Sequence, residues 1–226
     1  MPIKNVVIVH GAFADGSGWR DVFDILVKDG YAVSIVQIPL TSLADDVAAT
    51  KRALDLQQGP SLLVGHSYGG VVITEAGNAP NVAGLVYVAA FIPDQGESAV
   101  GLLSQAPAAN EDMRATKDDF LYLDPAAFPA DFAADVPPAQ ASFMAHSQPM
   151  LAKAAGGAPV TTAAWRHKKS WALIASHDHN INPDLERTMA KRAGCETIEV
   201  PGSHVVYQSK PKEVAHLIVR AAKAAG

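Results

Sequence analysis

Six short apolar runs recur along the chain and alternate with amphipathic segments. The runs are rich in Val, Ile and Leu and lie at 5–9, 32–38, 61–64, 83–89, 171–175 and 196–200. Apolar strands without polar alternation are typical of a parallel sheet that is buried on both faces. Helical patterns lie between them, at 18–28, 42–57, 68–78, 184–192 and 210–224. This repeated strand–helix order predicts a doubly wound, mostly parallel α/β sheet in a single domain over residues 1–226.

The segment at about 92–164 interrupts this rhythm. It is rich in Ala and Pro and shows helical fragments but no convincing strand. A structureless loop of that length is uncommon in a compact domain. The segment also carries more large apolar side chains than a solvated linker would: Phe120, Tyr122, Phe128, Phe132, Phe143 and Met144. We therefore expect an inserted helical cap that covers one end of the sheet and forms most of a pocket wall.

The strongest chemical signal is SLLVGHSYGGVVITEAG, at 61–77, which has the pattern of a strand, a sharp turn and a helix. The turn contains G-x-S-x-G, formed by Gly65, Ser67 and Gly69. A serine at such a junction adopts a strained backbone conformation, and glycines on either side avoid collisions with the neighbouring chain. The segment predicts that Ser67 is a nucleophile whose hydroxyl is lifted clear of the sheet.

The first strand runs into a second motif, VVIVHGAFADGSGW, at 6–19. A loop at this strand end can place backbone N–H groups beside the nucleophile, where the oxyanion of an acyl transfer must be held. We expect the amides of Ala12 and Tyr68 to be these donors. His10 is better explained as a buried, hydrogen-bonded residue that shapes the loop. A nucleotide site is not expected, because neither G-x-G-x-x-G nor a Walker lysine is present.

A serine nucleophile needs a base, and the chain offers eight histidines. Only His204 lies between the last predicted strand and the final helix, where the carboxyl edge of the sheet faces the serine. His66 flanks the nucleophile and is expected to support the loop. Of the remaining histidines, His146 lies in the cap, His167 before a strand and His216 in the last helix.

The residue that orients the base is expected at the carboxyl end of the strand at 171–175. The following loop, SHDHNINPD, supplies Asp178, and the chain order Ser67, Asp178, His204 is the one this fold uses. Asp94, after the preceding strand, is the competing carboxylate.

A metal site at 177–179 is not favoured, although His177, Asp178 and His179 are adjacent. In an extended strand end the two histidines point one way and the aspartate the other, which leaves at most two ligands on a side. No cofactor or metal is expected.

Composition narrows the function classes. The 226 residues carry a net charge of -5 and no stripe of Lys or Arg, so a nucleic-acid or anionic-membrane surface is not expected. The single cysteine cannot form an intrachain disulfide, and no signal peptide or membrane-spanning run is evident. We expect a cytoplasmic protein, monomeric or homodimeric, that acts on a small molecule.

The motifs HGAFADGSGW, GHSYGG, DHNINPD and GSH together resemble the α/β-hydrolase superfamily. Within it, the chain is similar to small capped serine esterases that include plant methyl esterases, hydroxynitrile lyases and bacterial arylesterase-like hydrolases. The resemblance runs from about residue 2 to the C-terminus and is weakest in the cap. It implies a Ser67–His204–Asp178 triad, oxyanion amides at Ala12 and Tyr68, and hydrolysis of small carboxylic esters through an acyl-enzyme.

Departures from the relatives narrow this expectation. Hydroxynitrile lyases of the group use an added lysine near the acid loop, and none stands at or just after Asp178, so ester hydrolysis is favoured over cyanide elimination. The acid loop has INPD where many relatives show a double proline. Lactone opening, perhydrolysis or acyl transfer on the same triad, and a ligand-binding relative with negligible turnover, stay open as alternatives.

Overall fold

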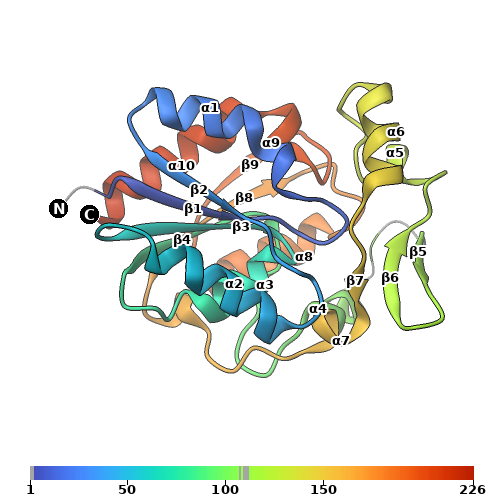
Figure 1. Ribbon diagram of the computed structural model, residues 1–226, viewed down its shortest axis with the longest axis horizontal. Coiled ribbons are helices and arrows are strands. Elements are labelled where there is room, and N and C mark those ends of the chain that lie inside the picture. The colour runs from blue at the N-terminus through green and yellow to red at the C-terminus, as the bar shows by residue number, and fades with distance from the viewer. Residues whose placement is uncertain (1–2, 107, 109–111) are drawn as a thin grey trace.

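The central feature of the computed structural model is a six-stranded, fully parallel sheet (Figure 1). The structure describes residues 3–106, 108 and 112–226. The strand order is β2-β1-β3-β4-β8-β9. The strands are β1 (Asn5–Val9), β2 (Ala32–Val36), β3 (Ser61–Ser67), β4 (Val82–Ala90), β8 (Lys169–Ala175) and β9 (Glu196–Val200). The predicted doubly wound sheet is confirmed, and β1 and β9 have the predicted bounds.

Helices cover both faces of this sheet. Figure 1 shows α1 and α10 on one side and α2 and α3 on the other, while α8 packs on β8. The bounds are α1 (Arg20–Lys28), α2 (Leu43–Asp55), α3 (Gly69–Ala76), α8 (Pro183–Arg192) and α10 (Pro211–Ala225). Local chemistry sets two of the starts. Ser42 caps α2 by accepting a hydrogen bond from the Asp45 N–H, and Asn182 caps α8 ahead of Pro183.

The centre of the sheet is the core of the protein. All residues of β1 and β3 are buried, whereas the edge strands β2 and β9 keep exposed positions. This distribution explains why the strands read as continuous apolar runs, because polar alternation needs a solvent-facing side. Three short helical segments complete the frame: η1 (Gly16–Trp19), η2 (Ala164–Arg166) and α9 (Val206–Ser209).

The insertion between β4 and β8 is a cap that contains both helices and strands. Its helices are α4 (Ala99–Gln105), α5 (Phe128–Asp131), α6 (Pro138–Ser147) and α7 (Lys153–Gly157). A three-stranded antiparallel sheet joins them: β5 (Met113–Ala115), β6 (Phe120–Leu123) and β7 (Leu151–Ala152). The expectation that this segment holds no strand is wrong. These strands are too short to show a reliable alternation, and tertiary pairing stabilises them.

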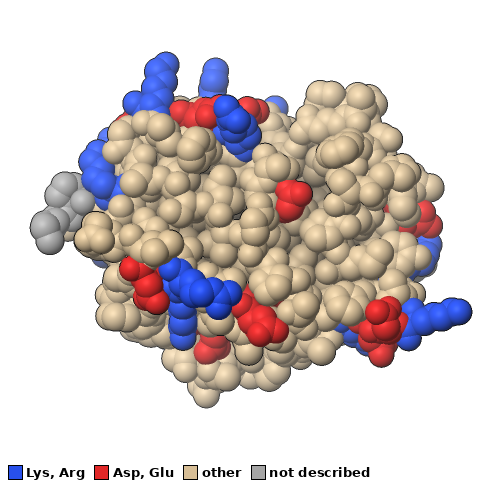
Figure 2. Space-filling view, viewed as in Figure 1, with Lys and Arg blue, Asp and Glu red and all other residues tan. Residues whose placement is uncertain are grey.

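Charged side chains of both signs are scattered over the face that Figure 2 shows. In Figure 2, Lys and Arg side chains are mixed with Asp and Glu side chains, and the lobe over α6 is uncharged in this view. Among the described residues, no helix combines the length and apolar character needed to cross a lipid bilayer.

Candidate active site

Three loops at the carboxyl edge of the sheet bring Ser67, His204 and Asp178 together. The Nε2 atom of His204 lies 2.8 Å from the Ser67 Oγ, and its Nδ1 lies 2.5 Å from the Asp178 Oδ2. The three residues are 7%, 1% and 3% exposed, respectively. Burial strengthens these hydrogen bonds because water does not compete for the polar atoms. The arrangement can move a proton from the serine hydroxyl to the imidazole.

The Ser67 turn has the strained geometry that the sequence predicts. Ser67 has a φ of 51°, in the left-handed region that non-glycine residues rarely adopt. A Cβ atom on Gly65 would lie 2.6 Å from the Gly69 carbonyl oxygen, and one on Gly69 would lie 2.6 Å from the Val9 carbonyl oxygen. Only glycine fits at these two positions, because backbone atoms cannot yield as a flexible side chain can.

The Asp178 loop fixes its carboxylate from both sides. Oδ1 accepts hydrogen bonds from the backbone N–H groups of Asn180 and Ile181, at 2.7 and 3.0 Å. Oδ2 is left to face His204. His177 and His179 are exposed while Asp178 is buried, which agrees with the expected alternation of side chains. Within the described part of the chain, no group of three or more His, Cys, Asp or Glu residues could hold a metal ion.

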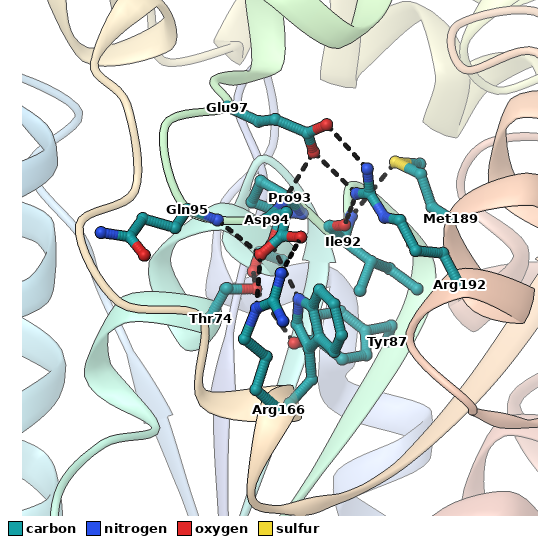
Figure 3. A network of polar contacts seen from close by, with 12 residues as sticks. Thr74, Tyr87, Ile92, Pro93, Asp94, Gln95, Glu97, Arg166, Met189 and Arg192 are labelled. Atoms are coloured by element: carbon teal, nitrogen blue, oxygen red, sulfur yellow. Dashed lines mark hydrogen bonds and ion pairs between the residues drawn. The ribbon is translucent and has the colours of Figure 1, made fainter.

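Asp94, the competing carboxylate, belongs to a different network (Figure 3). Its carboxylate receives two hydrogen bonds from the Arg166 guanidinium, at 2.8 and 2.5 Å, and these bonds hold the pKa of Asp94 below its usual range. Glu97 pairs with Arg192 beside it. The structure therefore brings Asp178, and not Asp94, to His204.

The loop after β1 lies directly against Ser67. A Cβ atom on Gly11 would lie only 2.7 Å from the Ser67 Cβ. The chain then turns sharply at Phe13, whose φ is 62°. Among the described groups, neither the Ala12 N–H nor the Tyr68 N–H donates to another protein atom, so both are available to a ligand beside Ser67.

Two further histidines support the site without facing the serine hydroxyl. His10 bonds to the Gly11 carbonyl at 2.8 Å and accepts the Ile38 N–H at 3.1 Å, so its Nδ1 carries the proton and it shapes the loop as expected. His66 donates from Nε2 to the His204 carbonyl oxygen at 2.9 Å. Burial, followed by the charge on His204, lowers the pKa of His66 well below its ordinary value. His66 is therefore a neutral support for the base loop.

Two buried carboxylic acids near the site were missed by sequence reasoning. Asp46 on α2 accepts hydrogen bonds from the Tyr68 hydroxyl at 2.8 Å and from the Leu40 N–H at 2.7 Å. Glu186 on α8 is 2% exposed, and burial together with the charge of Asp178 raises its pKa well above the ordinary value. The sequence contains a signal for both. Each acid lies at a helix position next to buried apolar residues, where a carboxylic acid needs a hydrogen-bonding or charged partner.

An apolar cavity of about 60 Å³ lies over Ser67 and His204. The cap supplies much of its wall, including Leu103, Met113, Leu121 and Leu151, and Asn180 is its polar contribution from the acid loop. A second cavity of about 140 Å³ lies between η1 and α6 and shares Phe13 with the first. No Lys or Arg lines either cavity, so neither offers a cation to a charged substrate.

Comparisons with known proteins place this geometry among related folds. The model of the alpha/beta hydrolase family matches residues 6–217. The carbendazim hydrolyzing esterase of Nocardioides sp. (strain SG-4G) is 36% identical over 120 residues, which cover 46% of this chain and 49% of that protein. The match thus spans about half the length of this curated relative.

Solved structures share the fold over nearly the whole chain. A pyrethroid hydrolase from Sphingobium faniae JZ-2 has a TM-score of 0.85 at 20% identity, with 98% of both chains covered. An extracellular alpha/beta-hydrolase from a Paenibacillus species has a TM-score of 0.83 at 22% identity, with 97% of this chain and 99% of that one covered. With a family match that extends over most of its residues, the chain belongs to the alpha/beta hydrolase family.

Proposed function

We propose that the protein is a serine esterase that hydrolyses small carboxylic esters through an acyl-enzyme. The observation that carries the proposal is the imidazole of His204 held between the Ser67 hydroxyl and the Asp178 carboxylate, at 2.8 and 2.5 Å, beneath an apolar cavity. The names of two relatives, an esterase and a pyrethroid hydrolase, support hydrolytic chemistry.

In the first step Ser67 Oγ attacks the ester carbonyl carbon while its proton passes to His204 Nε2. The Asp178 carboxylate faces Nδ1 of the same ring, so it stabilises the imidazolium that forms and keeps the ring in the required tautomer. The tetrahedral intermediate collapses when His204 returns the proton to the leaving alkoxide. An acyl group then remains on Ser67, and the alcohol departs.

The Ala12 and Tyr68 amides are the proposed oxyanion donors. Both lie beside Ser67, and their N–H groups are not used by other described groups. Such donors stabilise the charge that develops on the carbonyl oxygen, and losing one costs on the order of 3 kcal/mol in the transition state. Water attacks the acyl-enzyme in the second step with His204 as the base, and the carboxylic acid is released.

The cavity sets the substrate class. A volume of about 60 Å³ holds only a short apolar group, so the acyl portion is small. We assign the larger cavity beneath α6 to the alcohol portion, because Gln140, Gln148 and Tyr207 offer it polar as well as apolar contacts.

Covalent labelling and turnover test the proposal together. The wild type should be labelled at Ser67 by a fluorophosphonate and should hydrolyse p-nitrophenyl acetate. Ser67→Ala and His204→Ala should each lower kcat by about a million-fold. Undiminished turnover by folded Ser67→Ala would refute the assignment. Including methanol in the assay distinguishes hydrolysis from acyl transfer, because a transferase gives the methyl ester as the main product.

A further inference from the structure

One short stretch of the cap, at 131–135, contacts two of the three loops that carry the triad: the acid loop, which holds Asp178, and the base loop, which holds His204. The Asp131 carbonyl oxygen accepts a hydrogen bond from the side chain of Asn180 at 2.9 Å, in the acid loop. The Phe132 ring, 1% exposed, meets the His204 ring edge-on with centroids 4.9 Å apart. Asp135 reaches the residue that precedes His204. The cap is thus attached to the catalytic loops themselves and not only to the rest of the core.

Asp135 makes the most extensive of these contacts. Its Oδ2 accepts the Ser203 N–H at 2.8 Å and the Ser209 hydroxyl at 2.7 Å, and its Oδ1 accepts the Ser203 hydroxyl. Ser203 directly precedes His204, and Ser209 ends the short helix α9 that follows it. One carboxylate therefore fixes both ends of the segment that carries the base.

The carboxylate is ionised at neutral pH. Partial burial acts to raise the pKa of Asp135, but the hydrogen bonds from Ser203 and Ser209 outweigh it, and the pKa lies below its ordinary value. Hydrogen bonds to an ionised acceptor are roughly twice as strong as neutral ones. The Asp135 contacts are therefore strong enough to restrict where the base loop sits.

We propose that Asp135 is a positioning residue that holds His204 in line between Ser67 and Asp178, so that the seating of the cap controls alignment of the triad. The proposal rests on the proposed esterase function for its kinetic consequence. Catalysis depends steeply on such alignment, and a 1 Å misplacement costs about 100-fold in rate. Substrate binding depends on the cavity walls, which Asp135 does not line.

Three variants separate positioning from general cap stability. Asp135→Ala removes all three contacts, and Ser209→Ala removes one. Asp135→Asn keeps the shape of the side chain: its oxygen can accept the Ser203 N–H and the Ser209 hydroxyl, and its amide can donate to the Ser203 hydroxyl. Glu75→Ala is the matched control. Glu75 on α3 also holds the cap to the core, through the Thr161 N–H at 2.7 Å and hydroxyl at 2.5 Å, and its side-chain hydrogen bonds go to neither the acid loop nor the base loop.

The kinetic test uses p-nitrophenyl acetate, with thermal denaturation to verify folding. Asp135→Ala should lower kcat by about 10- to 100-fold with little change in KM, and Asp135→Asn should restore most of the loss. Ser209→Ala should lower kcat by less than Asp135→Ala does, and Glu75→Ala should retain kcat. The proposal is overturned if folded Asp135→Ala retains kcat, or if Glu75→Ala loses as much as Asp135→Ala does.

A second readout needs no substrate. The proton between His204 Nδ1 and Asp178 Oδ2 should give a low-field proton NMR signal in the resting enzyme. Asp135→Ala should shift or broaden this signal, whereas Glu75→Ala should leave it in place. An unchanged signal in Asp135→Ala refutes positioning. If the wild type neither labels at Ser67 nor turns over esters, the proposed function fails while this arm still tests the contact.

Discussion

Glu186 is expected to be a neutral carboxylic acid beside Asp178, and Glu186→Gln tests this directly. The side chain is buried on α8, and its Oε1 receives no N–H or O–H donor among the described groups. Burial, followed by the charge of Asp178, raises the pKa of Glu186 well above its ordinary value, while the Ala175 backbone and then the charge of Arg187 oppose the rise. Two ionised carboxylates close together in a buried site would repel each other strongly, so we expect Glu186 to keep its proton to a higher pH than an exposed glutamate does.

The sign of the effect on stability follows from proton linkage. Glu186 binds its proton more tightly in the folded protein than in the unfolded chain, so its contribution is fully present below the unfolded pKa and declines as pH rises toward the folded pKa. In that window a single group changes the free energy of unfolding by about 1 kcal/mol per pH unit. Gln carries no proton to lose, so Glu186→Gln should become progressively more stable than the wild type as the pH increases.

The assay is urea unfolding of both proteins from about pH 5 to pH 8, in steps of about one pH unit. The difference in unfolding free energy should increase with pH, and kcat at neutral pH should be nearly unchanged because Gln has nearly the same shape as the protonated acid and is also uncharged. Glu199→Gln is the matched control: Glu199 is paired with Arg187, which lowers its pKa, so its removal should give no gain at high pH. A stability difference for Glu186→Gln that does not vary with pH would refute the reasoning.

Three further predictions concern the core of the site. Tyr68→Phe leaves the buried Asp46 carboxylate without its hydroxyl donor and should cost about 1–3 kcal/mol in urea unfolding, and an unchanged midpoint would contradict the contact. Gly69→Ala places a methyl group 2.6 Å from the Val9 carbonyl oxygen, so little soluble protein is expected, and a normal yield of active enzyme would contradict the packing argument. Leu121→Ala enlarges the cavity over Ser67 and should raise the ratio of kcat/KM for p-nitrophenyl hexanoate over acetate by about 10-fold or more; an unchanged ratio would assign the acyl group elsewhere.

The elements of the central fold could be predicted from the sequence because strands that are buried on both faces are written as continuous apolar runs. The strands at 5–9 and 196–200 have the predicted bounds, and the turn around Ser67 was recognisable because strain demands glycine at fixed offsets. His204 and Asp178 were identified from their places after successive strands, and the structure brings them into contact with each other and with Ser67. The order of the strands along the chain therefore predicts which loops meet at the carboxyl edge of the sheet.

The parts that could not be predicted depend on tertiary partners. The cap strands have three, four and two residues, too few for a period to emerge. In the sequence, Asp135 looks like any loop aspartate, because its partners Ser203 and Ser209 lie about seventy residues away and are brought to it only by the fold. A polar residue reveals its type in the sequence, but its role depends on which donors or acceptors the fold places against it.

The groups around His204 have protonation states that serve one purpose. Burial raises the pKa of Glu186, which lies near Asp178, and lowers the pKa of His66, which lies beside the imidazole, so both side chains favour their uncharged forms. Asp135 is ionised, and its carboxylate accepts hydrogen bonds from Ser203 and Ser209. In the proposed mechanism, a protonated His66 would oppose the imidazolium that forms on His204 when Ser67 gives up its proton. In the proposed mechanism Asp178 is then the carboxylate that faces the new charge on His204, and a charge partner that is already in place lowers the cost of the proton transfer.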